Sequence, residues 1–242
     1  MGLFDKKYCD FCGSKIGMLG NRKLEDGNLC KACTGKLSPW FTERKKSTIA
    51  DIKEQLDYRE ANREAVEAFN VTRTIGDNYK VLLDEDAGKF LVTRDRKWKD
   101  ANPDVLDYSM VTGVTLNTKE HKSEKKRKGA DGKEVSFNPP VYEYSYDFEV
   151  TIHVNHPWFD EMSFEINSSD VEVGTRPMGS QQVTPEVQNY QDMANEIKEA
   201  LLSARQEARE GQARANAPKR AVQCPNCGAT TMPDATGCCE YC

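Results

Sequence analysis

The chain has 242 residues, of which 38% are hydrophobic and 30% are charged, and its formal net charge is −5 at pH 7. That length provides one middle-sized core with small modules attached, and it is too short for several large domains. The negative charge excludes a general attraction for nucleic acid or for an anionic membrane. No apolar stretch approaches the roughly 20 residues that span a bilayer, and the first residues lack the apolar segment of a signal peptide. We therefore expect a cytoplasmic protein.

Eight of the nine cysteines form Cys-x-x-Cys pairs near the two ends of the sequence, and none lies between Cys33 and Cys224. A disulfide framework would spread its cysteines through the core that it staples. Two residues between cysteines instead let both sulfurs face one metal ion at about 2.3 Å. The pattern predicts two structural zinc ions, each bound by four thiolates. The predicted ligands are Cys9, Cys12, Cys30 and Cys33 for the first ion, and Cys224, Cys227, Cys239 and Cys242 for the second.

Residues 1–45 are predicted to form the first zinc module. A gap of 17 residues separates its two cysteine pairs, which is within the range of a four-cysteine site. Gly13 gives the first pair the backbone freedom that a tight knuckle needs. Asp26-Gly27 indicates a small hairpin, and the second pair leads into a first helical turn. Knuckle, hairpin and helix are the order of a treble-clef-like module. A redox dithiol is the alternative, but such motifs accompany a βαβ pattern that is absent here.

Residues 46–70 are predicted to be a helical connector. The stretch is rich in good helix formers and contains no Gly or Pro. Ile49, Ile52 and Leu56 would line one helical face, and Ser47 is the expected N-cap. The strongly charged middle leaves open whether this is one helix or two short ones.

Residues 71–210 are predicted to form the central domain of an α+β protein. Between residues 78 and 168 the apolar period changes to two, and β-branched and aromatic residues dominate. With no helix expected between the strands, the pattern predicts an antiparallel sheet curled into a barrel or sandwich. The expected strands are Tyr79–Leu83, Lys89–Thr93, Tyr108–Asn117, Tyr142–Val154 and Met162–Ile166. Thr184 as N-cap and Pro185 at the first helical position then begin an amphipathic helix that closes the domain.

A basic run occupies residues 119–133, with seven basic and three acidic side chains and a net charge of +4. It lies between two expected strands and contains an Asp131-Gly132 turn, which predicts a long exposed hairpin loop. Charge runs of this kind are usually solvated surface.

The C-terminal part is predicted to be a polar tether, residues 211–222, followed by a short zinc ribbon, residues 223–242. The ribbon's two cysteine pairs are 11 residues apart. Cys238 could replace Cys239 as a ligand, although the spacing to Cys242 favours Cys239.

Other candidate sites are weak. The three histidines are His121, His153 and His156. His153 and His156 could approach at a strand end, but histidines alone at such spacing are nonspecific. No Gly-rich phosphate loop, nucleophile elbow or His-Glu-x-x-His motif is present. No carboxylate stands in an apolar context suited to acid/base chemistry. We therefore expect no enzymatic activity.

The N-terminal segment resembles a family of small zinc modules in bacterial proteins, known as a domain of unknown function. The resemblance is carried by Tyr-Cys-Asp-Phe-Cys-Gly-Ser-Lys-Ile-Gly, then Leu-Glu-Asp-Gly-Asn-Leu-Cys-Lys-Ala-Cys and Lys-Leu-Ser-Pro, within about the first 40 residues. It implies metal binding by the first four cysteines and no established activity. The middle is similar in outline to bacterial pleckstrin-homology-like domains, in which a basic strand loop can meet phosphoinositides. The tail resembles short bacterial zinc ribbons.

These features predict a bacterial, non-enzymatic adaptor that presents zinc modules and a β domain to a protein partner. The rival hypothesis is a nucleic-acid-binding protein that uses the zinc ribbon and residues 119–133. The net charge opposes it, as does the lack of basic residues between the ribbon's knuckles. Anionic lipid is a further candidate ligand for the same basic residues.

Overall fold

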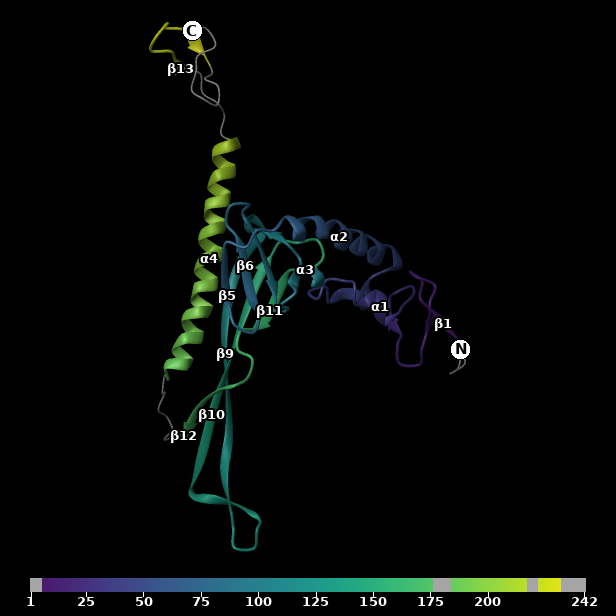
Figure 1. Ribbon diagram of the computed structural model, residues 1–242, viewed down its shortest axis with the longest axis vertical. Coiled ribbons are helices and arrows are strands. Elements are labelled where there is room, and N and C mark those ends of the chain that lie inside the picture. Colours follow the sequence, from purple (N-terminus) through teal and green to yellow (C-terminus); the bar gives the residue numbers. More distant parts are fainter. Residues whose placement is uncertain (1–5, 176–183, 217–221, 232–242) are drawn as a thin grey trace. The chain divides into compact units, whose positions relative to one another are not determined.

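The computed structural model of the protein describes residues 6–175, 184–216 and 222–231 (Figure 1). The chain divides into two compact units, Met1–Arg205 and Gln206–Cys242, and each is described by itself. Among the described residues, no helix is long and apolar enough to cross a membrane.

The first unit begins with two small hairpins and a short helix. Strand β1 (Lys7–Tyr8) pairs with β2 (Lys15–Ile16), and β3 (Arg22–Lys23) pairs with β4 (Asn28–Leu29). The predicted hairpin at Asp26-Gly27 is confirmed as the β3–β4 turn. Helix α1 (Lys31–Thr34) and a 3₁₀ turn, η1 (Glu43–Lys46), follow. These elements surround a small core of two cysteines and six aliphatic side chains: Cys9, Ile16, Leu24, Leu29, Cys33, Leu37, Ile52 and Leu56.

Helix α2 (Ile49–Ala68) is one continuous helix. Its N-cap is Thr48 and not the predicted Ser47. The Thr48 hydroxyl accepts a hydrogen bond from the Asp51 N–H at 3.2 Å, and the Asp51 carboxylate accepts one from the Thr48 N–H at 2.8 Å, which completes a capping box. Ser47 cannot supply this pair because the acidic residue stands three positions after Thr48. The first two turns of α2 place Ile52 and Leu56 in the cysteine-containing core.

The middle of α2 is fixed to the segment from Asn102 to Val105 by a buried polar network. The Arg59 Nη1 atom lies 2.8 Å from the Asp104 Oδ1 atom, and these side chains are 8% and 0% exposed. Asp104 also accepts hydrogen bonds from Ser38 at 2.8 Å and from Tyr58 at 3.2 Å. Ser38 belongs to the N-terminal segment, so Asp104 joins that segment and α2 to the β domain.

The described strands of the β domain form two four-stranded antiparallel sheets and not a closed barrel. The first sheet has the order β5 (Arg73–Gly76), β6 (Lys80–Asp84), β7 (Lys89–Thr93), β8 (Leu106–Asp107). A short helix that was not expected, α3 (Trp98–Ala101), lies between β7 and β8, and a 3₁₀ turn, η2 (Tyr108–Met110), follows β8. The second sheet consists of β9 (Val111–Lys128), β10 (Glu134–Val154), β11 (Glu161–Glu165) and β12 (Val171–Thr175). Strand β10 pairs with the other three.

The prediction of a long loop over residues 119–133 is wrong. Strand β9 continues to Lys128 and pairs with β10 along its length, so only residues 129–133 form the turn. The two strands run out together as a ribbon (Figure 1). Cross-strand contacts stabilise the basic strand. Lys125 pairs with Glu143 at 2.6 Å, and the Lys122 Nζ atom lies 3.9 Å from the centroid of the Tyr142 ring. The charges of residues 119–128 do not reveal this strand pairing, because their partners lie on the other strand.

Helix α4 (Pro185–Asn216) begins as predicted, with the Thr184 hydroxyl accepting a hydrogen bond from the Val187 N–H at 3.3 Å. It packs on both sheets. Tyr190 stacks on Phe148 of β10 with ring centroids 5.5 Å apart, and Glu196 pairs with Arg73 of β5 at 2.7 Å. The apolar stripe of this amphipathic helix faces the core, and its buried members are Val187, Ala194, Ile197 and Leu201. The helix continues beyond Gly211, so the first part of the predicted tether is helical. In the second unit, β13 (Val222–Gln223) pairs with β14 (Thr230–Thr231).

Candidate metal centre

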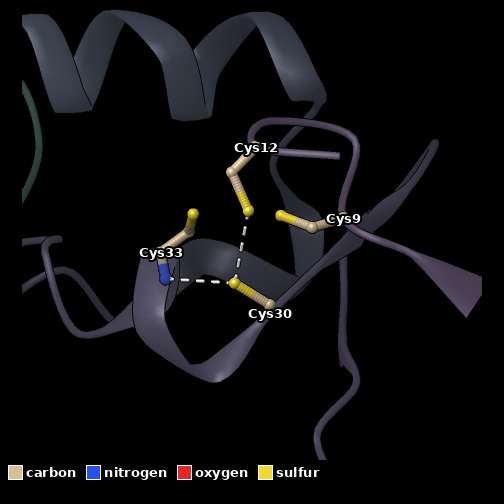
Figure 2. A group of neighbouring side chains, drawn as sticks. All are labelled: Cys9, Cys12, Cys30 and Cys33. Carbon is tan, nitrogen blue, oxygen red and sulfur yellow. Dashed lines mark hydrogen bonds between the residues drawn. The ribbon is translucent and has the colours of Figure 1, made fainter. Parts of the chain in front are cut away.

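Four cysteine side chains converge at the N-terminal module (Figure 2). The sulfur atoms of Cys9, Cys12, Cys30 and Cys33 all lie within 4.8 Å of one another. The Cys12 and Cys30 sulfurs are 3.7 Å apart, and none of the four cysteines forms a disulfide. Tetrahedral binding at about 2.3 Å requires sulfurs about 3.8 Å apart. The cluster therefore has the dimensions of a site for one metal ion.

The first two ligands come from a knuckle between β1 and β2. The Cys9 N–H donates to the Ser14 carbonyl at 2.9 Å, and the Gly13 N–H donates to the Cys9 carbonyl at 2.8 Å. Gly13 has a φ of 70°, a backbone conformation that glycine adopts at little cost. This tight turn directs both sulfurs of the pair to the same side.

The other two ligands lie at the start of α1. Cys30 is the N-cap, and its sulfur accepts a hydrogen bond from the Cys33 N–H at 3.3 Å. Thr34 closes the turn, because its N–H and its hydroxyl both donate to the Cys30 carbonyl at 3.0 Å. Cys33 follows one turn after the cap and faces the same point. The helix start thus holds a candidate metal ligand in the position that Ser or Asp usually occupies.

Two thiols of the cluster, those of Cys12 and Cys33, have opposing electrostatic environments. Hydrogen bonds from the side chain and the backbone of Ser14 lower the pKa of Cys12 to about 6. Burial, together with the neighbouring sulfurs, raises the pKa of Cys33 well above its ordinary value. Four thiolates this close repel one another unless a cation lies between them. A bound divalent metal removes that conflict because coordination deprotonates thiols. The donor set therefore fits a thiophilic divalent ion.

The second predicted quartet is described only in part. Cys224 and Cys227 form a knuckle of the same construction as the first. The Cys224 N–H donates to the Ala229 carbonyl at 2.8 Å, the Gly228 N–H donates to the Cys224 carbonyl at 2.9 Å, and Gly228 has a φ of 74°. The remaining predicted ligands, Cys239 and Cys242, lie outside the described residues, as does Cys238.

The structure does not bring His153 and His156 together as a metal pair. The His153 Nε2 atom lies 2.9 Å from the Thr115 hydroxyl, while the His156 ring contacts Tyr58 and Phe159, with centroids at 5.0 and 4.2 Å. His156 is half-buried against these rings, and this partial burial lowers its pKa.

A different histidine joins two carboxylates that sequence reasoning missed. One ligand atom each from His121, Asp147 and Asp170 lies within 4.8 Å of the others. The residues come from β9, from β10 and from the residue before β12, so only strand pairing reveals the cluster. Asn167 and Ser145 already donate to its two carboxylates, at 2.9 and 3.0 Å, and His121 is exposed. Its geometry is that of a surface hydrogen-bond network.

Comparison with known proteins identifies the N-terminal module alone. A family described as a domain of unknown function (DUF4428) matches residues 7–55, which include the first four cysteines and the beginning of α2. No curated protein and no solved structure matches the chain.

Proposed function

We propose that the protein is a non-enzymatic, cytoplasmic adaptor whose zinc modules and β domain present surfaces to a protein partner. The N-terminal module would be treble-clef-like, the middle domain pleckstrin-homology-like, and the tail a zinc ribbon. The observation that carries the proposal is the four-cysteine cluster together with the exposed apolar side chains of the same module.

Zinc is the metal that best suits the first cluster. An all-thiolate set of four ligands at tetrahedral spacing is typical of structural zinc. Four protein ligands leave no position open for a substrate, whereas catalytic zinc sites keep one. Cys9 and Cys33 are 2% and 3% exposed and belong to the small core, so the ion would be part of that core. This supports a structural role for the metal.

A second zinc ion in the C-terminal unit is supported by the repeated knuckle. Cys224 and Cys227 share the two backbone hydrogen bonds and the left-handed glycine of the first knuckle, with distances that agree within 0.1 Å. Cys239 and Cys242 would complete this site, as their spacing indicates.

A protein partner is supported by exposed apolar side chains on the N-terminal module. Six large hydrophobic residues are exposed among those described, and four of them belong to this module. They are Tyr8 at 52%, Phe11 at 42%, Met18 at 94% and Leu19 at 91% exposed. Apolar groups gathered on a surface commonly mark contacts with other proteins. Met18 and Leu19 lie in the turn after β2.

Nucleic-acid binding is the second candidate, because the basic run is a two-stranded ribbon instead of a loop. Such ribbons can enter the major groove of DNA. Against it, Lys119 and Lys125 are neutralised by carboxylates at 2.9 and 2.6 Å, and the chain as a whole is acidic. The adaptor is therefore the stronger proposal.

The metal proposal is tested by elemental analysis of purified, reduced full chain. We expect two zinc ions per chain, with Cys12→Ser and Cys227→Ser each losing one. The binding free energy of a structural zinc site is on the order of 10 kcal/mol and is also folding free energy, so each variant should unfold its own module. Zinc content of one ion or less in the unaltered chain would contradict the two-ion proposal.

The adaptor proposal is tested by purifying the tagged chain from its native cell. We expect a specific protein to co-purify, and to be lost when Met18 and Leu19 are changed to Ser. Val71→Ser, another exposed apolar position at 39%, is the matched control. Recovery of nucleic acid in place of protein would instead support the second candidate.

A further inference from the structure

A pocket of about 520 Å³ lies where three parts of the first unit meet. Trp40 comes from the N-terminal segment, Tyr79 and Arg94 come from the first sheet and its turns, and Glu161 comes from β11. The volume is in the range of pockets that hold small molecules or short peptide segments. None of the cysteines lines it, so it is separate from the metal centre.

One wall of the pocket is aromatic. The rings of Trp40 and Tyr79 are inclined at 50° with centroids 6.4 Å apart, and both also contact Phe164. The Arg94 guanidinium carbon lies 5.8 Å from the centroid of Tyr79. Tyr79 therefore already accepts a guanidinium on its face, which is the geometry of a cation–π contact.

The polar lining of the pocket is predominantly acidic. Asp95, Asp160 and Glu161 contribute three carboxylates, against the single guanidinium of Arg94. None of the three has an ion pair within the part of the chain that the structure describes. The excess of unpaired negative charge beside aromatic rings is complementary to a positively charged ligand.

The side chain that suits this pocket is cationic with an apolar stem. Arginine and lysine combine a positively charged end group with methylene groups that can lie along an aromatic ring. The carboxylates of the lining would pair with the charged end group, and the aromatic wall would contact the stem.

We propose that this pocket binds an arginine or lysine side chain on an extended segment of a partner protein. The inference rests on the proposed adaptor function and adds the chemistry of the partner. The net charge of −5 favours the approach of a basic partner as well. Asp160 and Glu161 would pair with the cation, and the Trp40 ring would cover its stem.

The test uses the zinc-loaded full chain and the peptide acetyl-Gly-Arg-Gly-amide as probe. The chain has three tryptophans, and the indole N–H signal of Trp40 can be assigned by its loss in Trp40→Phe. We expect this signal to shift with a Kd on the order of 1 mM or tighter. The citrulline peptide, which has the same shape without the charge, should bind about fivefold more weakly or worse.

Variants locate the site. Asp160→Asn combined with Glu161→Gln should weaken binding of the arginine peptide by about two- to fivefold for each charge removed. Asp86→Asn removes one exposed carboxylate from the β6–β7 turn and should leave affinity unchanged. All of these side chains are exposed, so the variants should retain the zinc content of the unaltered chain.

The proposal is overturned if the Trp40 signal does not move at about 10 mM peptide, or if the citrulline peptide binds equally well. It is also overturned if Asp86→Asn weakens binding as much as the pocket variants do. None of these results bears on the zinc content or on the co-purifying partner, so failure of the pocket proposal is distinguishable from failure of the proposed function.

Discussion

The buried ion pair between Arg59 and Asp104 gives the sharpest prediction about stability. In Asp104→Asn the side chain keeps its size, but the charge is lost while the Arg59 guanidinium stays buried. The Asn amide would also present a donor to Arg59, which has only donors. Breaking a buried pair by removing one partner costs about 3–5 kcal/mol. We expect the free energy of unfolding to fall by that amount, a large share of the 5–15 kcal/mol typical of a folded protein.

The assay is urea denaturation of the zinc-loaded chain, followed by circular dichroism. The matched control is Glu67→Gln, which removes one charge from an exposed pair with Lys99 at 3.5 Å, where the side chains are 73% and 43% exposed. This control should cost less than about 1 kcal/mol. A double change of Arg59→Met with Asp104→Leu removes both charges, and we expect it to be more stable than Asp104→Asn alone.

A loss of less than about 1 kcal/mol in Asp104→Asn, or a loss equal to that of the control, would refute this reasoning. It would mean that water reaches the Arg59 guanidinium and that the network does not fix α2 to the β domain. A double variant less stable than Asp104→Asn would show that packing, and not charge burial, determines the cost.

Three further outcomes are expected. Gly27→Ala should destabilise the N-terminal module by about 1–3 kcal/mol, because a Cβ there would lie 2.8 Å from the Ile49 Cδ1 atom. Gly17→Ala is the control, since a Cβ at Gly17 has no atom within 4 Å. Thermal melts should show a lower melting temperature for the Gly27 variant alone. Burial lowers the pKa of His156 in the folded state, so the unfolded chain binds the proton more readily and the free energy of unfolding should fall as the pH drops below about 6.5. Part of that fall should be absent in His156→Phe. Acid also removes metal, but it does so equally in both proteins, so the difference between them reports His156. Fluorescence anisotropy should show weak or no nucleic-acid binding at about 0.15 M salt, because screening confines the ribbon's charge to about 8 Å; submicromolar, salt-sensitive binding abolished by changing residues 125–128 to alanine would reverse the order of the two proposed functions.

The first cysteine cluster was predictable because its determinants are local. Each knuckle is specified by two cysteines, the residues between them and a following glycine, and such short segments adopt nearly the same turn wherever they occur. The agreement between the turns at Gly13 and Gly228 illustrates this, with φ values of 70° and 74°. The start of α4 was predictable for the same reason, since Thr184 and Pro185 act within one turn.

Periodicity identified strands but not their ends or their partners. Strand β10 alternates strongly, and its apolar face was evident. Strand β9, however, continues beyond its predicted end at Asn117 to Lys128, because β10 supplies partners for its charged side chains. Strands β5, β8 and β12 have only two to five residues each, too few for a periodic signal to stand out.

The sequence by itself determined which four cysteines form the N-terminal cluster, the α+β class and the helix at the end of the domain, because each depends on short local segments of chain. Only the tertiary structure decided that α2 is fixed to the β domain, since Arg59 and Asp104 are 45 residues apart and nothing near either one indicates the other. The same holds for the aromatic and acidic pocket, which joins Trp40 to Glu161. Such contacts depend on how whole elements pack, and packing is a property of the assembled fold that no short segment encodes.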